Sequence, residues 1–421
     1  MQNVPITALV DNGACLEFVQ TDHLGRLAGM RVLFTFIGGS GHFRPLIPFA
    51  RAALAAGHTV AVAGSGNRYD EITAAGFTAF RTSEPKPPST DEPAQTPEPV
   101  DLAREERVLR DNFAGRGARR HAAAIREIAL EWQPDVIVRD EIDFGSAIAA
   151  EKLGIPCVSV IVLLAGGLAR NEVIREPISA LRAENGLVPD PDLTRLPGQL
   201  VIMPAPPSVR DPRYPLPKDT FWCAPDDHAP RRAHAADQPL VYLTLGTLDT
   251  YRSVFERLLA GLRDLPVRLV VTVGRRLDPA SFGAQPEQVR IEQFVPQNEI
   301  FAEADLVIAH GGSGTLIGSL AHGIPSVLLP MGADQPYNTR RCVELGTALE
   351  LDPVTFTPEG AARAVTTMLH EDSYRRAAQR IQDEINALPE PAQALGLIEA
   401  LVPAHRRSSV QCSAFGGASD G

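Results

Sequence analysis

The segment HGGSGT (310–315) brings together residue types that bind anions. It lies between an apolar strand pattern and a helical pattern at 316–323. A strand that stops at a glycine-rich turn before a helix leaves free backbone N–H groups at the positive end of the helix, which suits a diphosphate. Ser313 and Thr315 add hydroxyl donors, and a ring N–H of His310 can reach a phosphate oxygen. On its own the segment could equally be a tight turn, and it lacks the Gly-Lys-Ser/Thr of a Walker loop.

A carboxylate and an amide follow the next strand pattern, PSVLLP (325–330). Ligands of open α/β sheets bind at the carboxyl ends of the strands, where Asp334 and Gln335 stand. This pair can hold vicinal hydroxyls of a sugar ring, although alone it would be an ordinary turn. Upstream, Phe294 and Val295 could place an aromatic ring and backbone groups against a base, although Phe294 alone would be a core residue. Together these segments predict a site for one extended ligand, a nucleotide-diphosphate sugar.

A candidate general base lies near the other end of the chain, where His42 follows the first apolar strand pattern in GHFRP. An imidazole can accept a proton at neutral pH, although His42 taken alone would be a helix-cap or solvent histidine. Asp140 ends the strand pattern PDVIVRD (134–140), so two parallel strands would bring both residues to one sheet edge. A carboxylate there can orient the imidazole and stabilise its charged form. Glu141 and Asp143 lie close by and could take that role instead.

The composition limits the class of protein that carries these residues. A chain of 421 residues is too long for one compact core and fits two domains of roughly 150–200 residues. Its net charge of −11 disfavours nucleic acid as a partner. An apolar run of about 18 residues and a signal peptide are both lacking, so we expect no membrane span and a cytoplasmic protein. Five widely spaced cysteines indicate neither a disulfide framework nor a zinc site, and no carboxylate pair has metal-ligand spacing.

Strand and helix patterns alternate in both halves of the chain, an order that requires parallel sheets and an α/β fold. Two long stretches, 81–100 and 164–200, are expected to be irregular, the second with helical pieces. Strands are expected at 31–37, 58–63, 134–140, 155–163, 240–245, 267–273, 289–291, 305–309 and 325–329. Helices are expected at 45–57, 101–133, 144–153, 316–323 and 372–402.

The same patterns divide the chain into two similar halves joined by a proline-rich stretch. We expect an extension at 1–29, a first, acceptor-binding domain at 30–203 and a linker at 204–239. A second, nucleotide-sugar-binding domain is expected at 240–385, a helix packing back towards the first domain at 386–402, and a disordered tail at 403–421.

Between Phe294 and Asn338 the sequence resembles the donor-binding signature of family 1 glycosyltransferases with the GT-B fold. The elements are FVPQ, HGGSGT, Gly-Ile-Pro at 323–325 and ADQPYN. The resemblance is strongest to the bacterial branch that decorates natural products such as macrolides and enediynes, and it covers nearly all of 31–402. It implies two Rossmann-like domains whose parallel sheets face an interdomain cleft.

The resemblance also implies a role for each candidate residue. GHxxP is where the general base of the family falls, which assigns that role to His42 with Asp140 as its partner. Many plant members carry tryptophan where Phe294 stands, so the choice between uridine and thymidine stays open. The implied diphosphate contacts come from Thr247, His310, Gly312, Ser313, Gly314 and Thr315, the sugar contacts from Asp334 and Gln335, and the base contacts from Phe294 and Val295.

The reaction that follows is direct displacement at the anomeric carbon with inversion. His42 deprotonates the acceptor hydroxyl, and a helix end replaces a divalent metal at the departing diphosphate. No cofactor is expected besides the UDP- or TDP-sugar donor. The expected acceptor is a small apolar aglycone of antibiotic biosynthesis, and the expected assembly is a monomer or homodimer.

Three other classes of function compete with transfer. A dinucleotide-dependent oxidoreductase is disfavoured because Arg44 occupies the third glycine position of GxGxxG and the second strand ends without an acid. An epimerase acting on the nucleotide sugar would need no acceptor pocket, which the long loops argue against. A non-catalytic partner of another transferase would not need intact His42 and His310 motifs.

Overall fold

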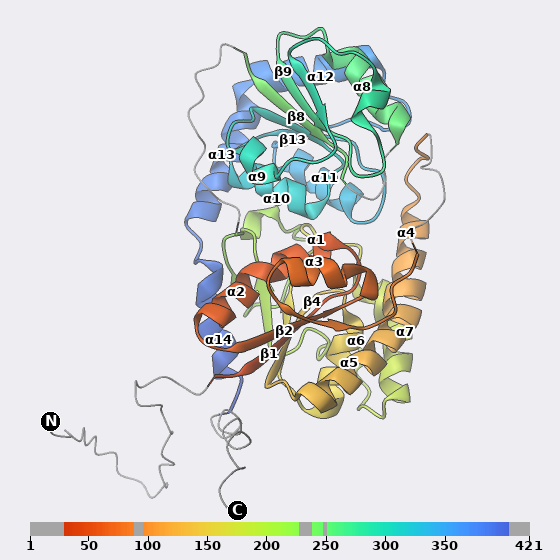
Figure 1. Ribbon diagram of the computed structural model, residues 1–421, viewed down its shortest axis with the longest axis vertical. Coiled ribbons are helices and arrows are strands. Elements are labelled where there is room, and N and C mark those ends of the chain that lie inside the picture. Colours follow the sequence, from red (N-terminus) through yellow and green to blue (C-terminus); the bar gives the residue numbers. More distant parts are fainter. Residues whose placement is uncertain (1–28, 88–95, 227–237, 247–250, 404–421) are drawn as a thin grey trace, which may run out of the picture.

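A computed structural model describes residues 29–87, 96–226, 238–246 and 251–403. It contains two α/β domains stacked end to end (Figure 1). Thr247 and nearly all of the extension at 1–29 and the tail at 403–421 lie outside the described residues. Within the described residues, no helix has both the length and the apolar character needed to cross a bilayer.

The first domain is built on a parallel sheet of seven strands in the order β3-β2-β1-β4-β5-β6-β7. The strands pack as near-continuous apolar runs because helices cover both faces. Their bounds are β1 Arg31–Thr35, β2 Thr59–Gly64, β3 Thr78–Arg81, β4 Val136–Asp140, β5 Cys157–Val160, β6 Leu200–Met203 and β7 Phe221–Trp222.

The second domain repeats this architecture with six parallel strands in the order β10-β9-β8-β11-β12-β13. The α/β prediction with two parallel sheets is therefore confirmed. The bounds are β8 Leu240–Thr244, β9 Arg268–Thr272, β10 Val289–Glu292, β11 Leu306–Ala309, β12 Ser326–Leu328 and β13 Ala348–Glu350.

Four strands fall outside the predicted ranges: β3, β6, β7 and β13. Each has two to four residues and lies towards or at the edge of its sheet, where a short run gives little apolar periodicity. Because β7 pairs with β6 inside the range expected as a linker, 204–239, the first sheet extends into that range.

Helices connect the strands of the first domain. A π-helical stretch, η3 (Leu109–Gly117), joins α4 to α5, and the helix expected at 45–57 begins as a 3-10 turn, η1 (Arg44–Leu46). Asp143 caps α6 by accepting the Ser146 N–H, and Gly154 ends it in a left-handed conformation at φ 64°. The bounds are α1 Ser40–Phe43, α2 Ile47–Ala55, α3 Tyr69–Ala74, α4 Leu102–Val108, α5 Ala118–Trp132, α6 Phe144–Leu153 and α7 Asn171–Glu184.

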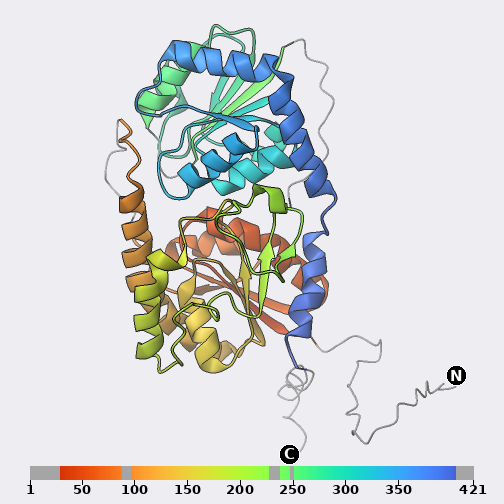
Figure 2. The ribbon, with the colours of Figure 1, turned by 180° about the vertical axis from the view of Figure 1, so that it is seen from behind.

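The second domain ends in a helix that leads back to the first (Figures 1 and 2). Prolines interrupt the helix expected at 372–402, so α13 and α14 are separate, and α14 packs against α2. His58 Nε2 lies 2.9 Å from Glu399 Oε1 at that contact. The bounds are α8 Arg252–Leu262, α9 Gln297–Phe301, α10 Ser313–Ala321, α11 Gln335–Glu344, α12 Pro358–His370, α13 Asp372–Asn386 and α14 Ala394–Ala400.

The strand order fixes where each sheet can bind a ligand. In the first sheet the direction of winding reverses between β1 and β4, and in the second between β8 and β11. Loops leave such a switch point in opposite directions and open a crevice at the carboxyl ends of the strands. In the first sheet, His42 follows β1 and Asp140 ends β4. In the second sheet, His310 follows β11. The topology thus puts both candidate centres at switch points.

Candidate active site

The segment after β11 forms an open helix N-terminus. Gly312 is the N-cap residue of α10, it provides no side-chain cap, and the first turn carries no acidic residue. The first helical bond in this helix runs from the Leu316 N–H to the Gly312 carbonyl. The N–H groups of 313–315 therefore precede the helical ladder and can donate to an anion.

The His310 ring packs between two glycines. A Cβ on Gly246, which has φ +82°, would lie 2.9 Å from ring atoms of His310, and a Cβ on Gly312 would clash with its Nε2 atom. Burial lowers the pKa of His310 to about 4. The ring is therefore a neutral imidazole at physiological pH and can give one N–H to a ligand.

The two hydroxyl groups of the same segment have different partners. Ser313 Oγ donates to Asp334 Oδ2 over 2.7 Å and accepts the Leu164 N–H over 2.9 Å. Its single proton is therefore committed to Asp334, and the Ser313 backbone N–H is the donor left for an anion. Thr315 Oγ1 accepts from Gln297 Nε2 at 3.2 Å, which leaves the proton of that hydroxyl available.

Asp334 and Gln335 stand together at the start of α11. Burial raises the pKa of Asp334, and hydrogen bonds from Ser313 and Asn338 oppose that rise. Gln335 Oε1 accepts the Met331 N–H over 2.8 Å. The turn before them is strained, because Ala333 has φ +51°.

The two residues expected near the base differ in exposure. The Phe294 ring is 54% exposed and is one of the most exposed large apolar side chains among the described residues, whereas Val295 is buried. An exposed aromatic ring beside a binding loop has a free face for stacking. Val295 instead belongs to the core under α9.

His42 and Asp140 come together at the edge of the first sheet. His42 Nδ1 lies 3.8 Å from Asp140 Oδ2. The ring packs against Gly38, where an added Cβ would lie 2.9 Å from His42 Cδ2, and Gly38 has φ +108°. Glycine there meets both the backbone conformation and the close contact.

The charges of His42 and Asp334, which belong to different domains, act on each other. Burial alone lowers the pKa of His42, but the carboxylate of Asp140 outweighs it, and the charges of Asp334 and Glu141 add to the rise above the usual value. The charge of His42 in turn lowers the pKa of Asp334 against the effect of burial. The candidate base is therefore electrostatically coupled to the candidate sugar-binding carboxylate of the other domain.

The two competing carboxylates have other partners. Asp143 Oδ2 lies 3.1 Å from Nε2 of the buried His121. Burial raises the pKa of Asp143, but the charge of protonated His121 and the hydrogen bonds around the carboxylate outweigh burial and lower the pKa. Glu141 Oε1 accepts the Leu163 N–H over 2.7 Å. Of the three acids, Asp140 is the one beside His42.

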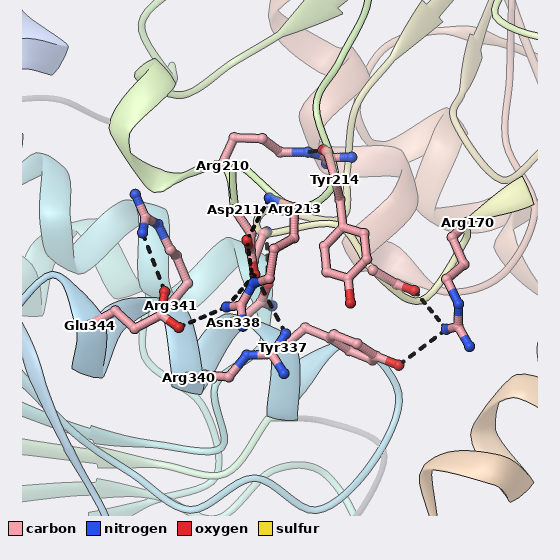
Figure 3. A network of polar contacts seen from close by, with 12 residues as sticks. Arg170, Arg210, Asp211, Arg213, Tyr214, Tyr337, Asn338, Arg340, Arg341 and Glu344 are labelled. Atoms are coloured by element: carbon pink, nitrogen blue, oxygen red, sulfur yellow. Dashed lines mark hydrogen bonds and ion pairs between the residues drawn. The ribbon is translucent and has the colours of Figure 1, made fainter.

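Contacts between the domains concentrate on α11 (Figure 3). Tyr337 OH donates to Glu106 of α4 over 3.3 Å, and Arg340 lies 3.4 Å from Asp211. Asp211 in turn pairs with Arg213 at 2.7 Å. The helix that starts with the sugar-site pair is thus also the docking element.

Sequence reasoning missed Asn338 and Arg210. Asn338 ends the ADQPYN motif and is completely buried, with hydrogen bonds to both domains. Its place in the motif was the available signal. Arg210 donates to the Leu163 carbonyl over 3.0 Å and lies in the range expected as a linker, so no pattern marked it.

No group of three or more His, Cys, Asp and Glu side chains within 29–87, 96–226, 238–246 and 251–403 is arranged to hold a metal ion.

Known proteins resemble the chain in sequence and fold. Residues 256–401 match the family described as erythromycin biosynthesis protein CIII-like, C-terminal domain. The 10-deoxymethynolide desosaminyltransferase of Streptomyces venezuelae is 28% identical over 440 residues, which cover 90% of this chain and 98% of that protein. The aclacinomycin-T 2-deoxy-L-fucose transferase of Streptomyces galilaeus is 27% identical over 438 residues, with 90% and 97% covered.

A solved structure agrees with these relatives. The glycosyltransferase SsfS6 of Streptomyces sp. SF2575, complexed with thymidine diphosphate, superposes with a TM-score of 0.66 at 25% identity and covers 88% of this chain and 99% of its own. The chain is therefore a glycosyltransferase of the GT-B fold with an erythromycin CIII-like C-terminal domain, and it is similar to glycosyltransferases of natural-product biosynthesis.

Proposed function

We propose that this glycosyltransferase moves a sugar from a TDP-sugar to a hydroxyl of a small apolar aglycone, with His42 as general base and without a metal ion. The observation that carries the proposal is the coupling of charge between His42 and Asp334 of the other domain, together with Ser313, which is hydrogen-bonded both to Asp334 and to the Leu164 N–H across the interface. A base and a sugar-binding carboxylate on opposite domains are what a transfer between two bound substrates needs.

The donor end of the proposal rests on the open N-terminus of α10. The N–H groups of Ser313, Gly314 and Thr315, with the neutral His310 ring, would bind the diphosphate. The exposed face of Phe294 would stack on the base. We propose thymidine rather than uridine as the base of the donor, because a similar structure was solved with thymidine diphosphate.

The Asp334 carboxylate and the Nε2 amide N–H groups of Gln335 would bind hydroxyls of the sugar ring. Gln335 Oε1 already accepts the Met331 N–H, so the amide N–H groups of that side chain remain free to donate to the sugar. Asp334 is held at its Oδ2 atom by Ser313. Thr247, which follows β8 in the sequence, would add a diphosphate contact.

The reaction would be a single displacement. The acceptor oxygen forms a bond to the anomeric carbon while the bond from that carbon to the β-phosphate oxygen breaks, so the configuration inverts. The hydroxyl proton passes to His42 Nε2, because Nδ1 faces Asp140. Asp140 then stabilises the imidazolium, and the bond electrons leave with TDP, whose charge the α10 N-terminus and His310 hold.

The acceptor class rests on the relatives. One of them is named for 10-deoxymethynolide and another for aclacinomycin-T, so the proposed acceptor is an aglycone of that natural-product kind. Residues of α4, η3 and the stretch from 163 to 170 would form its binding wall, since they lie on the first-domain side of the interface.

Two measurements test the proposal. A thermal-shift panel of UDP, TDP, GDP and their glucose conjugates should give its largest rise with TDP or TDP-glucose, because a ligand that binds the folded state raises the melting temperature. Incubation with TDP-glucose and 10-deoxymethynolide should then give a glycoside. Conversion of the donor alone would indicate an epimerase, and binding without any conversion would indicate a non-catalytic partner.

A further inference from the structure

Asn338 occupies a position that neither the diphosphate site nor the general base explains. It lies in the first half of α11, one turn after Asp334, and is completely buried. A buried primary amide must find partners for its oxygen and for both of its N–H groups, or its burial is costly. All of these partners belong to the diphosphate loop, the sugar-site carboxylate or the other domain.

Within its own domain, Asn338 Nδ2 faces three oxygens. It lies 2.7 Å from Asp334 Oδ2, 3.0 Å from the Gly311 carbonyl oxygen and 3.1 Å from Ser313 Oγ. The bond to Asp334 is the shortest and is strengthened by the charge of the carboxylate. The amide nitrogen of Asn338 therefore links the Asp334 carboxylate to the turn that carries the diphosphate donors.

On its other side the amide reaches the first domain. Asn338 Oδ1 accepts the Ala165 N–H over 2.9 Å, next to the bond from the Leu164 N–H to Ser313. A reversed amide would turn its N–H groups towards the Ala165 N–H and its oxygen towards the three oxygens, so the orientation is fixed. The backbone N–H groups of Leu164 and Ala165, which follow β5, thus hold Ser313 and Asn338 against the first domain.

We propose that Asn338 is a positioning residue, whose amide holds the Asp334 carboxylate and the diphosphate loop in one arrangement and anchors both to the first domain at Ala165. The inference rests on the proposed function, because it assigns Asp334 to the sugar of the donor. Asn338 itself touches neither sugar nor phosphate. It aims groups that do, as a supporting hydrogen bond aims a ligand-binding side chain.

The consequence is selective for the sugar. Loss of the amide removes its shortest bond, the one to Asp334, and leaves Ser313 as the remaining side-chain partner of that carboxylate. The N–H groups of α10 are also fixed by their own helix, so the affinity for TDP should change less than the affinity for TDP-glucose. Asn338→Ala should therefore weaken binding of TDP-glucose by about tenfold or more relative to TDP, since a hydrogen bond to a charged group has about that effect. The quantity to measure is the Kd of TDP divided by the Kd of TDP-glucose, by calorimetry on the full chain. This ratio falls when binding of TDP-glucose weakens relative to binding of TDP.

Asn338→Asp separates positioning from packing through pH. At pH 8 the new carboxylate repels Asp334 over a hydrogen-bond distance, so the ratio should fall as in the alanine variant. At pH 6 the two acids should share a proton, which restores a donor to Asp334 and keeps an acceptor for the Ala165 N–H. The ratio should then recover in the aspartate variant and stay low in the alanine variant. The charges of His42 and Glu141 also act on the Asp334 site from the first domain, and Glu105 accepts the Ala333 N–H just before it. The wild type is therefore measured at both pH values.

Cys342→Ala is the matched control, since Cys342 is buried on the same helix in the hydrophobic core. It should lower the melting temperature and leave the ratio unchanged. A ratio that is unchanged in Asn338→Ala, a low ratio at both pH values in Asn338→Asp, or an equal fall in Cys342→Ala would each overturn the inference. Failure of the wild type to bind either TDP or TDP-glucose would instead overturn the proposed function, and the inference with it.

Discussion

His42 Nδ1 lies 3.8 Å from Asp140 Oδ2, and that carboxylate is held still by backbone N–H groups. Ile37 donates to Oδ2 over 2.9 Å, and Ile142 and Asp143 donate to Oδ1 over 2.7 Å and 3.0 Å. The separation is longer than a direct hydrogen bond. Since Asp140 cannot rotate, the imidazole is the partner that must move to close the gap when it takes a proton.

The first prediction concerns His42 itself. His42→Ala should lower kcat by about 10²–10⁴-fold, which is the usual contribution of a general base. Affinity for TDP-glucose should stay close to that of the wild type, because the donor groups lie on the other domain. Turnover and calorimetry on the same preparation measure the two effects. Unchanged turnover would rule out His42 as the base.

The second prediction concerns the pH profile of Asp140→Asn. Because the Asp140 carboxylate raises the pKa of His42 against the effect of burial, its neutralisation should lower that pKa. Transfer needs neutral His42, so kcat/KM rises with pH through this pKa, and the rising limb should move to lower pH in the variant. The plateau should also fall by about 10²–10⁴-fold, since the imidazolium loses its partner.

Circular dichroism is the control for that variant. An asparagine amide cannot accept all three backbone N–H groups around Asp140, so some loss of stability is expected at about 1–3 kcal/mol. Kinetics are therefore measured well below the melting temperature of the variant. If the rising limb of the kcat/KM profile of Asp140→Asn lies at the same pH as in the wild type, Asp140 does not act on the pKa of His42.

Sequence patterns were sufficient for the strands at the centre of each sheet. Long apolar runs such as those of β1, β4 and β11 are buried on both faces, which gives a clear signal. β7, with two half-buried residues, gives no such signal, and it lies in the range expected as a linker. Its position depends on pairing with β6, a contact between segments about twenty residues apart that no local pattern encodes.

The places of the candidate residues in the fold could be predicted from the sequence, but their hydrogen bonds could not. His42, Asp140, His310 and Asp334 all stand at strand ends or helix starts, which the patterns located. That the Ser313 proton goes to Asp334 depends on the Leu164 N–H from the other domain, and the sequence contains no signal for docking. The same reason hid Asn338, whose partners lie on three separate segments.

The third prediction uses two glycines of the diphosphate loop. A Cβ on Gly314 would meet nothing within 4 Å, in the space where we propose that the diphosphate binds. Gly314→Ala should therefore weaken TDP binding by about tenfold or more and leave the melting temperature unchanged or slightly higher, because alanine favours the helix. Gly312→Ala should weaken binding and also lower the melting temperature, since its Cβ collides with His310.

Gly396→Ala is the control for this pair, because its Cβ also meets nothing within 4 Å but it lies on α14, away from the diphosphate loop. It should bind TDP as the wild type does. If Gly314→Ala does too, the diphosphate does not approach the start of α10.

The last prediction concerns the pH dependence of stability. Burial raises the pKa of Glu141 to about 7, although the charge of Arg210 and the Leu163 N–H oppose the rise. The folded state therefore binds a proton that the unfolded state releases at the ordinary value for glutamate, so this residue costs stability as pH rises from about 4.5 towards 7. Glu141→Gln keeps an acceptor for the Leu163 N–H and removes the titration. Its melting temperature should fall less than that of the wild type between pH 5 and pH 7.5, and the gap should be largest at the upper end. Glu127→Gln, on the exposed face of α5, should follow the wild-type curve. Parallel curves for Glu141→Gln and the wild type would mean that Glu141 is ionised in the folded protein throughout this range.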